Sequence, residues 1–185
     1  MRAPRRVLVG AGIALALLVI VLGVRALFQR PVGGGAGVVA DDGLGVGMQA
    51  VTLYFADPEG ADLATERRDL VVGTQTSMLV SAALSALAEG PLDRLARTVP
   101  EGTRIRHVFV DNDGAVYADF TSELARGMAG AGLSQEILLL RSLARTLDVN
   151  FRNLRTLVIL VDGKAVPSLG GRIATDRPLV LSEWR

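Results

Sequence analysis

The sequence predicts an α+β domain with one mixed β-sheet and two helices packed on one face of that sheet, preceded by a single N-terminal transmembrane helix. Three observations support this prediction. Strand-like and helix-like segments follow the order strand, strand, helix, hairpin, helix, hairpin, edge strand. Each helix-like segment has one apolar face, which must be buried against another element. An uncharged stretch of 18 residues lies near the N-terminus.

The uncharged stretch comprises residues 7–24 and would form a helix about 27 Å long, close to the thickness of a bilayer's hydrocarbon core. Arg2, Arg5 and Arg6 precede it, so the positive-inside rule predicts a cytoplasmic N-terminus and an extracytoplasmic domain, periplasmic or outside the cell. A cleaved signal peptide and a buried core helix are the alternatives. The residues after Val24 form a poor cleavage site, and flanking arginines disfavour a core helix.

Composition divides the chain further. We expect a basic tip and anchor in residues 1–30, a glycine-rich flexible linker in residues 31–48 and a folded domain in residues 49–185. The net charge is +1, but residues 1–30 hold five arginines and no acid, which leaves residues 31–185 at −4. That charge argues against nucleic acid as a partner. The absence of cysteine excludes disulfides, thiolate sites and lipidation at a cysteine.

In the first half of the domain, residues 51–56 and 66–72 are predicted strands. The charged residues 66–68 are typical of a solvated strand edge. Residues 76–89 form a predicted amphipathic helix that ends at Gly90, the residue type favoured directly after a helix.

In the second half, residues 104–111 and 114–120 form a predicted hairpin, with Tyr117 and Asp119 on the face opposite to Val116, Ala118 and Phe120. Residues 127–132 form a predicted loop of small residues. A second helix then begins after Ser134 as its N-cap and continues to about Asp148.

The last predicted elements lie within residues 154–179. The apolar run at residues 157–161 predicts a strand that is buried on both faces. Asp162 and Gly163 follow it and predict a type I′ turn, which needs positive φ at both central positions. The return strand would comprise residues 164–166. A closing edge strand is predicted for four residues, Pro178, Leu179, Val180 and Leu181.

Several motifs resemble the GerMN domain family, named after a sporulation and spore germination protein. They are VTLYFAD at residues 51–57, ERR at 66–68, PEGT at 100–103, VDNDGAVYADFTSEL at 110–124, and VDGKAVPSLGG at 161–171 followed by DRPL. The resemblance covers roughly residues 49–181. It implies an extracytoplasmic module of bacterial envelope proteins, which are often lipoproteins. The lack of cysteine departs from those lipoprotein members.

Few residues here support a named reaction. His107 is the only histidine, so a catalytic triad would have to use it and a zinc site would lack ligands. Residues 111–113 resemble the start of a calcium loop, but a hairpin turn explains them better, because the glycine comes too early and the later ligands are missing. Asp119 and Glu123 are the least unsuitable pair of carboxylates for glycoside hydrolysis. We therefore expect no catalytic, cofactor or metal site.

The resulting hypothesis is a membrane-anchored, non-catalytic module that binds another envelope protein or copies of itself. Its predicted interaction edge comprises Pro178, Leu179, Val180 and Leu181, because an edge strand can accept the backbone of another chain. Two alternatives remain. One is a glycan-acting enzyme that uses Asp119 and Glu123, and the other is a carrier of a small ligand.

Overall fold

The computed structural model describes residues 46–184. The elements in order are β1 (Val46–Ala56), β2 (Leu63–Gly73), α2 (Thr76–Glu89), β3 (Ile105–Val110), β4 (Ala115–Phe120), α3 (Glu123–Met128), α4 (Leu133–Asn150), β5 (Thr156–Val161), β6 (Lys164–Ala165), β7 (Leu179–Val180) and the 3-10 turn η1 (Leu181–Trp184).

The predicted transmembrane span, residues 7–24, lies outside the described residues, as does most of the predicted linker. Among the helices that the structure describes, none has the length and hydropathy needed to cross a bilayer.

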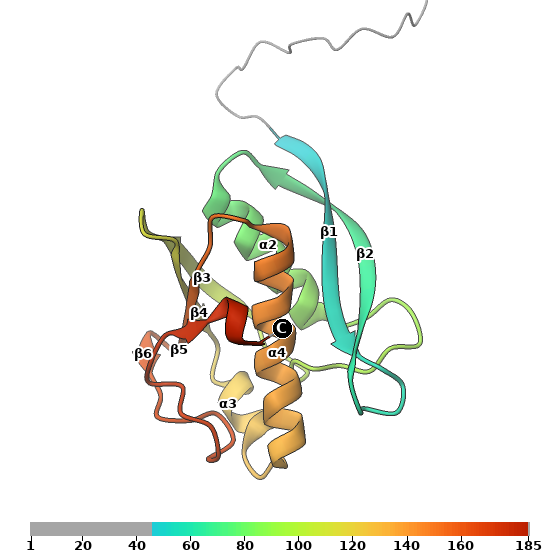
Figure 1. Cartoon of the computed structure of the whole chain (residues 1–185), viewed down its shortest axis with the longest axis vertical. Helices are drawn as coiled ribbons and strands as arrows, with labels where there is room; N and C mark the ends of the chain where they lie inside the picture. The colour runs from blue at the N-terminus through green and yellow to red at the C-terminus, as the bar shows by residue number, and fades with distance from the viewer. Residues whose placement is uncertain (1–45, 185) are drawn as a thin grey trace, which may run out of the picture. The chain divides into compact units, whose positions relative to one another are not determined.

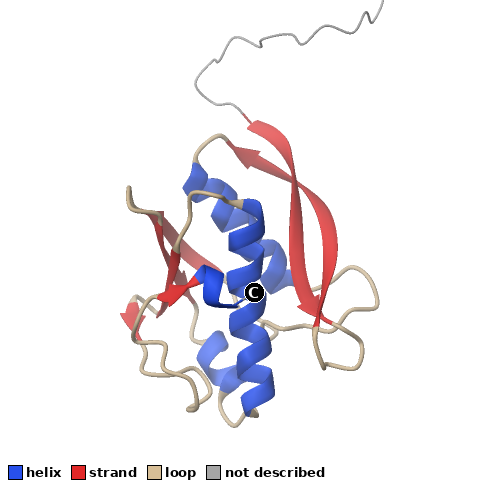
Figure 2. Cartoon of the chain, viewed as in Figure 1, coloured by secondary structure: helices blue, strands red, loops and turns tan. Residues whose placement is uncertain are grey.

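The α+β class and the order of the predicted elements are confirmed, but the single sheet is wrong. β1 and β2 form a separate antiparallel hairpin, and β3 to β7 form a second, five-stranded sheet. The second sheet is mixed, because β4 pairs antiparallel with β3 and parallel with β5. Figures 1 and 2 show α2 and α4 between the hairpin and the larger sheet rather than together on one face of a single sheet.

This arrangement explains the buried side chains of α4. A helix between two sheets must be apolar on more than one side. The three consecutive residues Leu138, Leu139 and Leu140 are all buried, and so are Leu143 and Leu147 further along the helix. Together with the inward-facing residues of β1, β4 and β5, they form one hydrophobic core.

Local sequence signals were most reliable where turn and cap residues fixed the backbone. The helix at residues 76–89 has the predicted bounds, and Gly90 follows it with φ of 94°. Asp162 and Gly163 have φ of 50° and 76°, as a type I′ turn requires. The second helix was placed less well: its N-cap is Gly132, so Ser134 lies inside the first turn. Part of the predicted loop at 127–132 belongs to the short helix α3.

Candidate functional site

The predicted interaction edge is a two-residue strand, β7, paired antiparallel with the start of β5. Leu179 and Leu181 are buried, whereas Pro178 and Val180 are exposed. The Leu181 amide donates to the Arg155 carbonyl at 2.9 Å, so the alternation of an antiparallel ladder turns the N–H and C=O of Val180 away from β5. The segment therefore lies at the sheet margin and presents the backbone of one residue, Val180.

A buried carboxylate holds the loop that leads to β7. Glu136, in the first turn of α4, is 0% exposed, and its Oε1 accepts from the Ser168 hydroxyl and the Gly170 amide, both at 2.9 Å. Its Oε2 accepts from the Arg172 amide at 3.2 Å. A Cβ at residue 170 would lie 2.9 Å from Oε2, so glycine permits this close approach. The carboxylate accepts hydrogen bonds from loop amides that have no backbone acceptor in a helix or sheet.

The hydrogen bonds also decide the protonation of Glu136. Burial raises the pKa of this carboxyl, but the bonds from Gly170, Ser168 and neighbouring loop amides outweigh it and hold the pKa below its ordinary value of 4.5. Sequence reasoning missed this residue. Its available signal was an acidic residue directly before the four aliphatic residues 137–140, at a position where solvent exposure was not expected.

The outward side of the larger sheet carries a row of apolar side chains. Phe109 is 63% exposed and Tyr117 is 37% exposed, and their ring centroids lie 6.0 Å apart. Tyr117 is opposite Val158 on β5. Two residues before Val158, and on the same side of the sheet, Thr156 is opposite Val180 on β7. We call the surface formed by Phe109, Tyr117, Val158 and Val180 the outer face. It connects the aromatic pair to the predicted edge.

The outer face exists because β5 is only partly covered. The apolar run at residues 157–161 was expected to be buried on both sides, and this expectation is wrong. Leu157, Ile159 and Val161 are buried in the core, whereas Val158 and Leu160 are half-buried on the opposite side. A continuous apolar run is typical of a doubly covered strand, but here the helices pack on one side of the larger sheet.

The two carboxylates considered for catalysis have other partners. Asp119 is 6% exposed; its Oδ1 accepts from the Gly163 amide at 2.7 Å, and its Oδ2 lies 3.2 Å from Arg106 Nη1. It therefore closes the turn between β5 and β6. Glu123 forms an ion pair with Arg126 one turn along α3, at 2.7 Å. The structure gives both groups a role in local structure.

The structure places the histidine on a strand surface and gives residues 111–113 a role in a turn. His107 is exposed on β3 opposite Asp119. Asp111 Oδ1 accepts from the amides of Asp113 (3.0 Å) and Ala115 (2.8 Å), which closes the turn between β3 and β4. Within residues 46–184, no group of three or more His, Cys, Asp or Glu side chains is placed to hold a metal ion.

The charged start of the second strand is not the solvated edge that was expected. Glu66 and Arg68 form an ion pair whose side chains are each 11% exposed, and only Arg67 between them faces solvent. Glu66 Oε2 accepts from the Leu92 amide at 2.8 Å, and Arg68 Nη2 donates to the Gly90 carbonyl at 3.0 Å. The pair thus fixes the chain after α2. Strand alternation places residues 66 and 68 on the inner side, which charge alone concealed.

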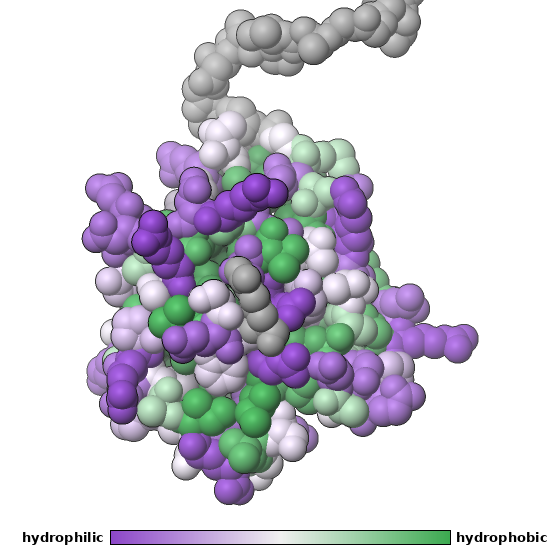
Figure 3. All heavy atoms as spheres, viewed as in Figure 1, coloured by the Kyte–Doolittle hydropathy of each residue, from purple (hydrophilic) through white to green (hydrophobic). Residues whose placement is uncertain are grey.

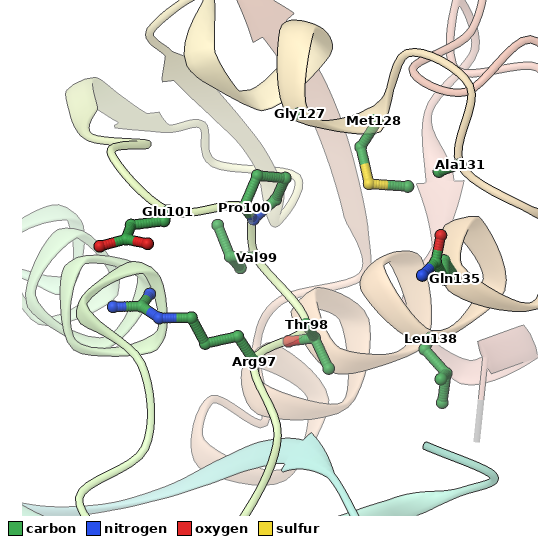
Figure 4. Close-up of a pocket in the computed structure, with 10 residues that line it drawn as sticks. All are labelled: Arg97, Thr98, Val99, Pro100, Glu101, Gly127, Met128, Ala131, Gln135 and Leu138. Atoms are coloured by element: carbon green, nitrogen blue, oxygen red, sulfur yellow. The ribbon is translucent and has the colours of Figure 1, made fainter. Parts of the chain in front are cut away.

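Cavities near the end of α2 are the candidate sites for a small ligand. Figure 4 shows one of about 200 Å³, lined by Arg97, Thr98, Val99, Pro100, Glu101, Gly127, Met128, Ala131, Gln135 and Leu138. A neighbouring cavity of about 570 Å³ shares Arg97 and Glu101 and also contacts Glu89 and Arg104. Ligand pockets are commonly about 300–1,000 Å³ and mostly apolar. The larger cavity has a suitable volume, but its walls are charged.

Comparison with known families gives one match that covers more than half of the chain. The sequence model of the family described as "Germane: Sporulation and spore germination" matches residues 52–167. The predicted edge at residues 178–181 lies beyond the matched region. No curated protein matches this sequence significantly.

Solved structures share the fold at low sequence identity. A protein from Clostridium perfringens, provisionally described as a lipoprotein, is 20% identical with a TM-score of 0.53, over 79% of this chain and 95% of that one. The first GerMN domain of the sporulation protein GerM from Bacillus subtilis is 19% identical with a TM-score of 0.54, over 71% of this chain and 93% of that one. The tandem GerMN domains of GerM give 20% identity and a TM-score of 0.54, over 71% of this chain and 46% of that one.

Proposed function

Because the chain belongs to the sporulation and spore germination family, we propose that it is a membrane-anchored, extracytoplasmic domain that binds protein in the bacterial envelope rather than catalysing a reaction. In this proposal residues 1–30 form the cytoplasmic tip and the anchor. Residues 31–48 form the linker, and residues 49–185 form the working domain. The link to sporulation or germination comes from the family.

The sequence of residues 7–24 supports the anchor, since it has the length and the lack of charge that a membrane span needs. The Clostridium perfringens protein of the same fold is provisionally described as a lipoprotein, which supports a place in the envelope. A lipoprotein is held at the membrane by lipid on a cysteine. This chain has no cysteine to carry such a lipid, so the proposal assigns attachment to the peptide segment of residues 7–24.

The outer face is the observation that carries the proposal of protein binding. An exposed phenylalanine beside a half-exposed tyrosine is typical of an interface, because aromatic side chains bury a large area at low entropic cost. Val180 adds an outward N–H and C=O at the margin of the same surface. A partner strand that pairs with Val180 would extend the sheet beyond β7, so contact with Val158 and Tyr117 would come from the part of the partner that covers the outer face.

The settings of the carboxylates favour binding over catalysis. A general acid or a nucleophile needs an oxygen that is free to reach substrate. Both oxygens of Asp119 are engaged, with Gly163 and with Arg106, and Glu123 is paired with Arg126. These contacts explain why the two groups are carboxylates without reference to a substrate.

Crosslinking in membranes tests the proposal. The full chain is expressed in envelope membranes, treated with an amine-reactive crosslinker, and purified under denaturing conditions so that bound proteins are recovered with it. Phe109→Ser should weaken binding by about 2 kcal/mol, or roughly thirtyfold in Kd. Leu92→Ser is the matched control, because Leu92 is 80% exposed and lies in a loop away from the outer face. Equal recovery from both variants would place the interface elsewhere, and recovery of no partner would overturn the proposal.

The topology has its own test. Protease added to spheroplasts should digest the domain, whereas a tag ahead of residue 7 should remain protected, because arginines precede the span. Digestion of the tag with protection of the domain would reverse the proposed orientation.

A further inference from the structure

A second exposed apolar patch lies at the start of β1 and is made of residues outside the outer face. Met48 is 74% exposed and is paired directly with Val71 on β2, which is 69% exposed. Met78, in the first turn of α2, is 51% exposed and lies against Gly73, two residues beyond Val71 on the same side of the hairpin. We call the group Met48, Val71 and Met78 the hairpin patch. Three large apolar side chains thus share one exposed end of the domain.

The chain segments that form the hairpin patch carry no charge. Residues 43–56 and 70–88 contain no Asp, Glu, Lys, Arg or His. Asp69 is the nearest charged residue on the same side of β2, and the chain near the patch is rich in Gly, Thr, Ser and Gln. Figure 3 shows white and pale green atoms at this end of the molecule, where Figure 1 places the start of β1, with purple hydrophilic atoms beside them. Small polar and apolar groups without charge suit the interface between lipid headgroups and acyl chains.

The patch also lies where the chain comes from the proposed anchor. β1 begins at Val46, and the apolar stretch ends at Val24, so the 21 residues 25–45 connect the two. Fully extended, they reach about 75 Å at most. The start of β1 is the part of the domain joined directly to this connection, so it is the part nearest to the proposed anchor along the chain.

We propose that the hairpin patch rests on the lipid surface of the membrane in which residues 7–24 are anchored, and that this contact orients the domain. The inference rests on the anchor of the proposed function. Lipid fits better than a second copy of the chain, because the patch has none of the tryptophan, tyrosine or arginine side chains that carry most of the binding energy at protein interfaces. Methionine is flexible and apolar, so it adapts to a disordered surface. The outer face would then be free for a protein partner.

Single-cysteine labelling tests this placement, because the chain has no cysteine of its own. The full chain is reconstituted in vesicles of phosphatidylethanolamine and phosphatidylglycerol, with the environment-sensitive dye NBD on Met48→Cys or Val71→Cys. Leu92→Cys is the matched control: it is more exposed than either residue and follows the opposite end of α2 from Met78. We expect blue-shifted emission at the two patch sites, quenched by nitroxide-labelled lipid, and neither effect at the control.

Each other outcome has a defined meaning. A blue shift without quenching by the nitroxide lipid would show that protein covers the patch, and it would overturn the lipid contact. Equal emission at the patch and control sites would overturn it as well. Alkaline carbonate washing of the same vesicles tests the anchor separately. Loss of the chain into the wash would overturn the anchor of the proposed function, whatever the labels report.

Discussion

Strands β1 and β7 both lie at the margin of a sheet, and the protein treats their outward backbones differently. On β1, the N–H and C=O of Thr52 bond to the side chain of Asn150, at 2.9 and 2.7 Å. The Tyr54 amide donates to Thr146 Oγ1, and the Tyr54 carbonyl accepts from Ser142 Oγ. Every outward group of these two strand residues is therefore occupied by α4.

At the β7 margin, the α4 side chain Glu136 bonds to the loop before β7 and not to the backbone of β7 itself. Its outward residue, Val180, is 38% exposed, and the strand is held in place indirectly, through the loop that Glu136 of α4 binds. One helix thus closes the margin of β1 with side chains and positions the margin of β7 while leaving it open. An exposed strand margin invites pairing with other chains, so closing one and keeping the other short limits where pairing can occur.

The largest expected effect comes from removing the support of the open margin. Glu136→Ala should lower the free energy of unfolding by about 3 kcal/mol, because the loop amides that bond to this buried carboxylate lose a charged acceptor. Urea denaturation measures the loss. Glu136→Gln keeps one acceptor oxygen but turns an NH2 group toward other donors. Its free energy of unfolding should therefore lie between those of the alanine variant and the wild type. A urea midpoint for Glu136→Ala equal to that of the wild type would mean that the loop keeps its conformation without the carboxylate.

Opening the closed margin should have the next largest effect. Asn150→Ala should cost about 2 kcal/mol, because Thr52 loses partners for both its amide and its carbonyl. Hydrogen exchange of the Thr52 amide should become faster. Asn150→Asp keeps the acceptor for that amide and should restore its protection in part. Unchanged exchange in the alanine variant would show that β1 is not closed by α4.

The turn beside the open margin provides a smaller effect. Gly163→Val should cost about 1–2 kcal/mol, because a β-branched residue resists the positive φ of 76° found there. No atom lies within 4 Å of a Cβ at this position, so the cost is one of backbone conformation alone. Asp162→Asn is the control, since asparagine tolerates positive φ. An unchanged urea midpoint for Gly163→Val would mean that the turn rearranges at little cost.

Acid should weaken the open margin through Glu136. The pKa of this carboxyl is lower in the folded protein than its ordinary value of 4.5. Its contribution to stability is therefore complete above that value and is lost as pH falls through the lower, folded-state pKa. Glu136→Gln should lose less stability than the wild type on acidification below pH 4.5. Parallel pH profiles for the two proteins in urea denaturation would contradict this assignment.

The smallest effect on stability is expected at Val180. Because its N–H points away from β5, Val180→Pro should change the free energy of unfolding by no more than about 0.5 kcal/mol. The same variant should recover less crosslinked partner, since one outward donor is gone. A large loss of stability would show that this N–H belongs to the ladder.

The contrast between the two margins also shows what the sequence can predict. The turn at Asp162 and Gly163 was predictable because its chemistry lies within two residues. The closure of the β1 margin by Asn150 was not predictable, because Thr52 and Asn150 are 98 positions apart and polar residues on a helix usually face solvent.

The same limit explains the error in the number of sheets. Periodicity identified strands but not their partners, so the β1–β2 hairpin was merged with the larger sheet. The run Leu138, Leu139 and Leu140 was the available sign that α4 is covered on more than one side. Of the four residues of the predicted edge, Leu179 and Val180 form β7 at the sheet margin, whereas Pro178 precedes the strand and Leu181 begins η1. The aromatic pair of the outer face was not identified, because nothing in the sequence shows which side of a sheet lacks a helix.

The parallel pairing of β4 with β5 has a consequence for how the chain folds. Residues 115–120 must wait for residues 156–161, which follow only after both α3 and α4. The core therefore closes late, through contacts between distant parts of the chain, and folding of this kind is comparatively slow. If the domain is exported across a membrane, as the proposed function requires, late closure would keep the chain unfolded during transport. Once β5 has crossed, folding would prevent the chain from sliding back.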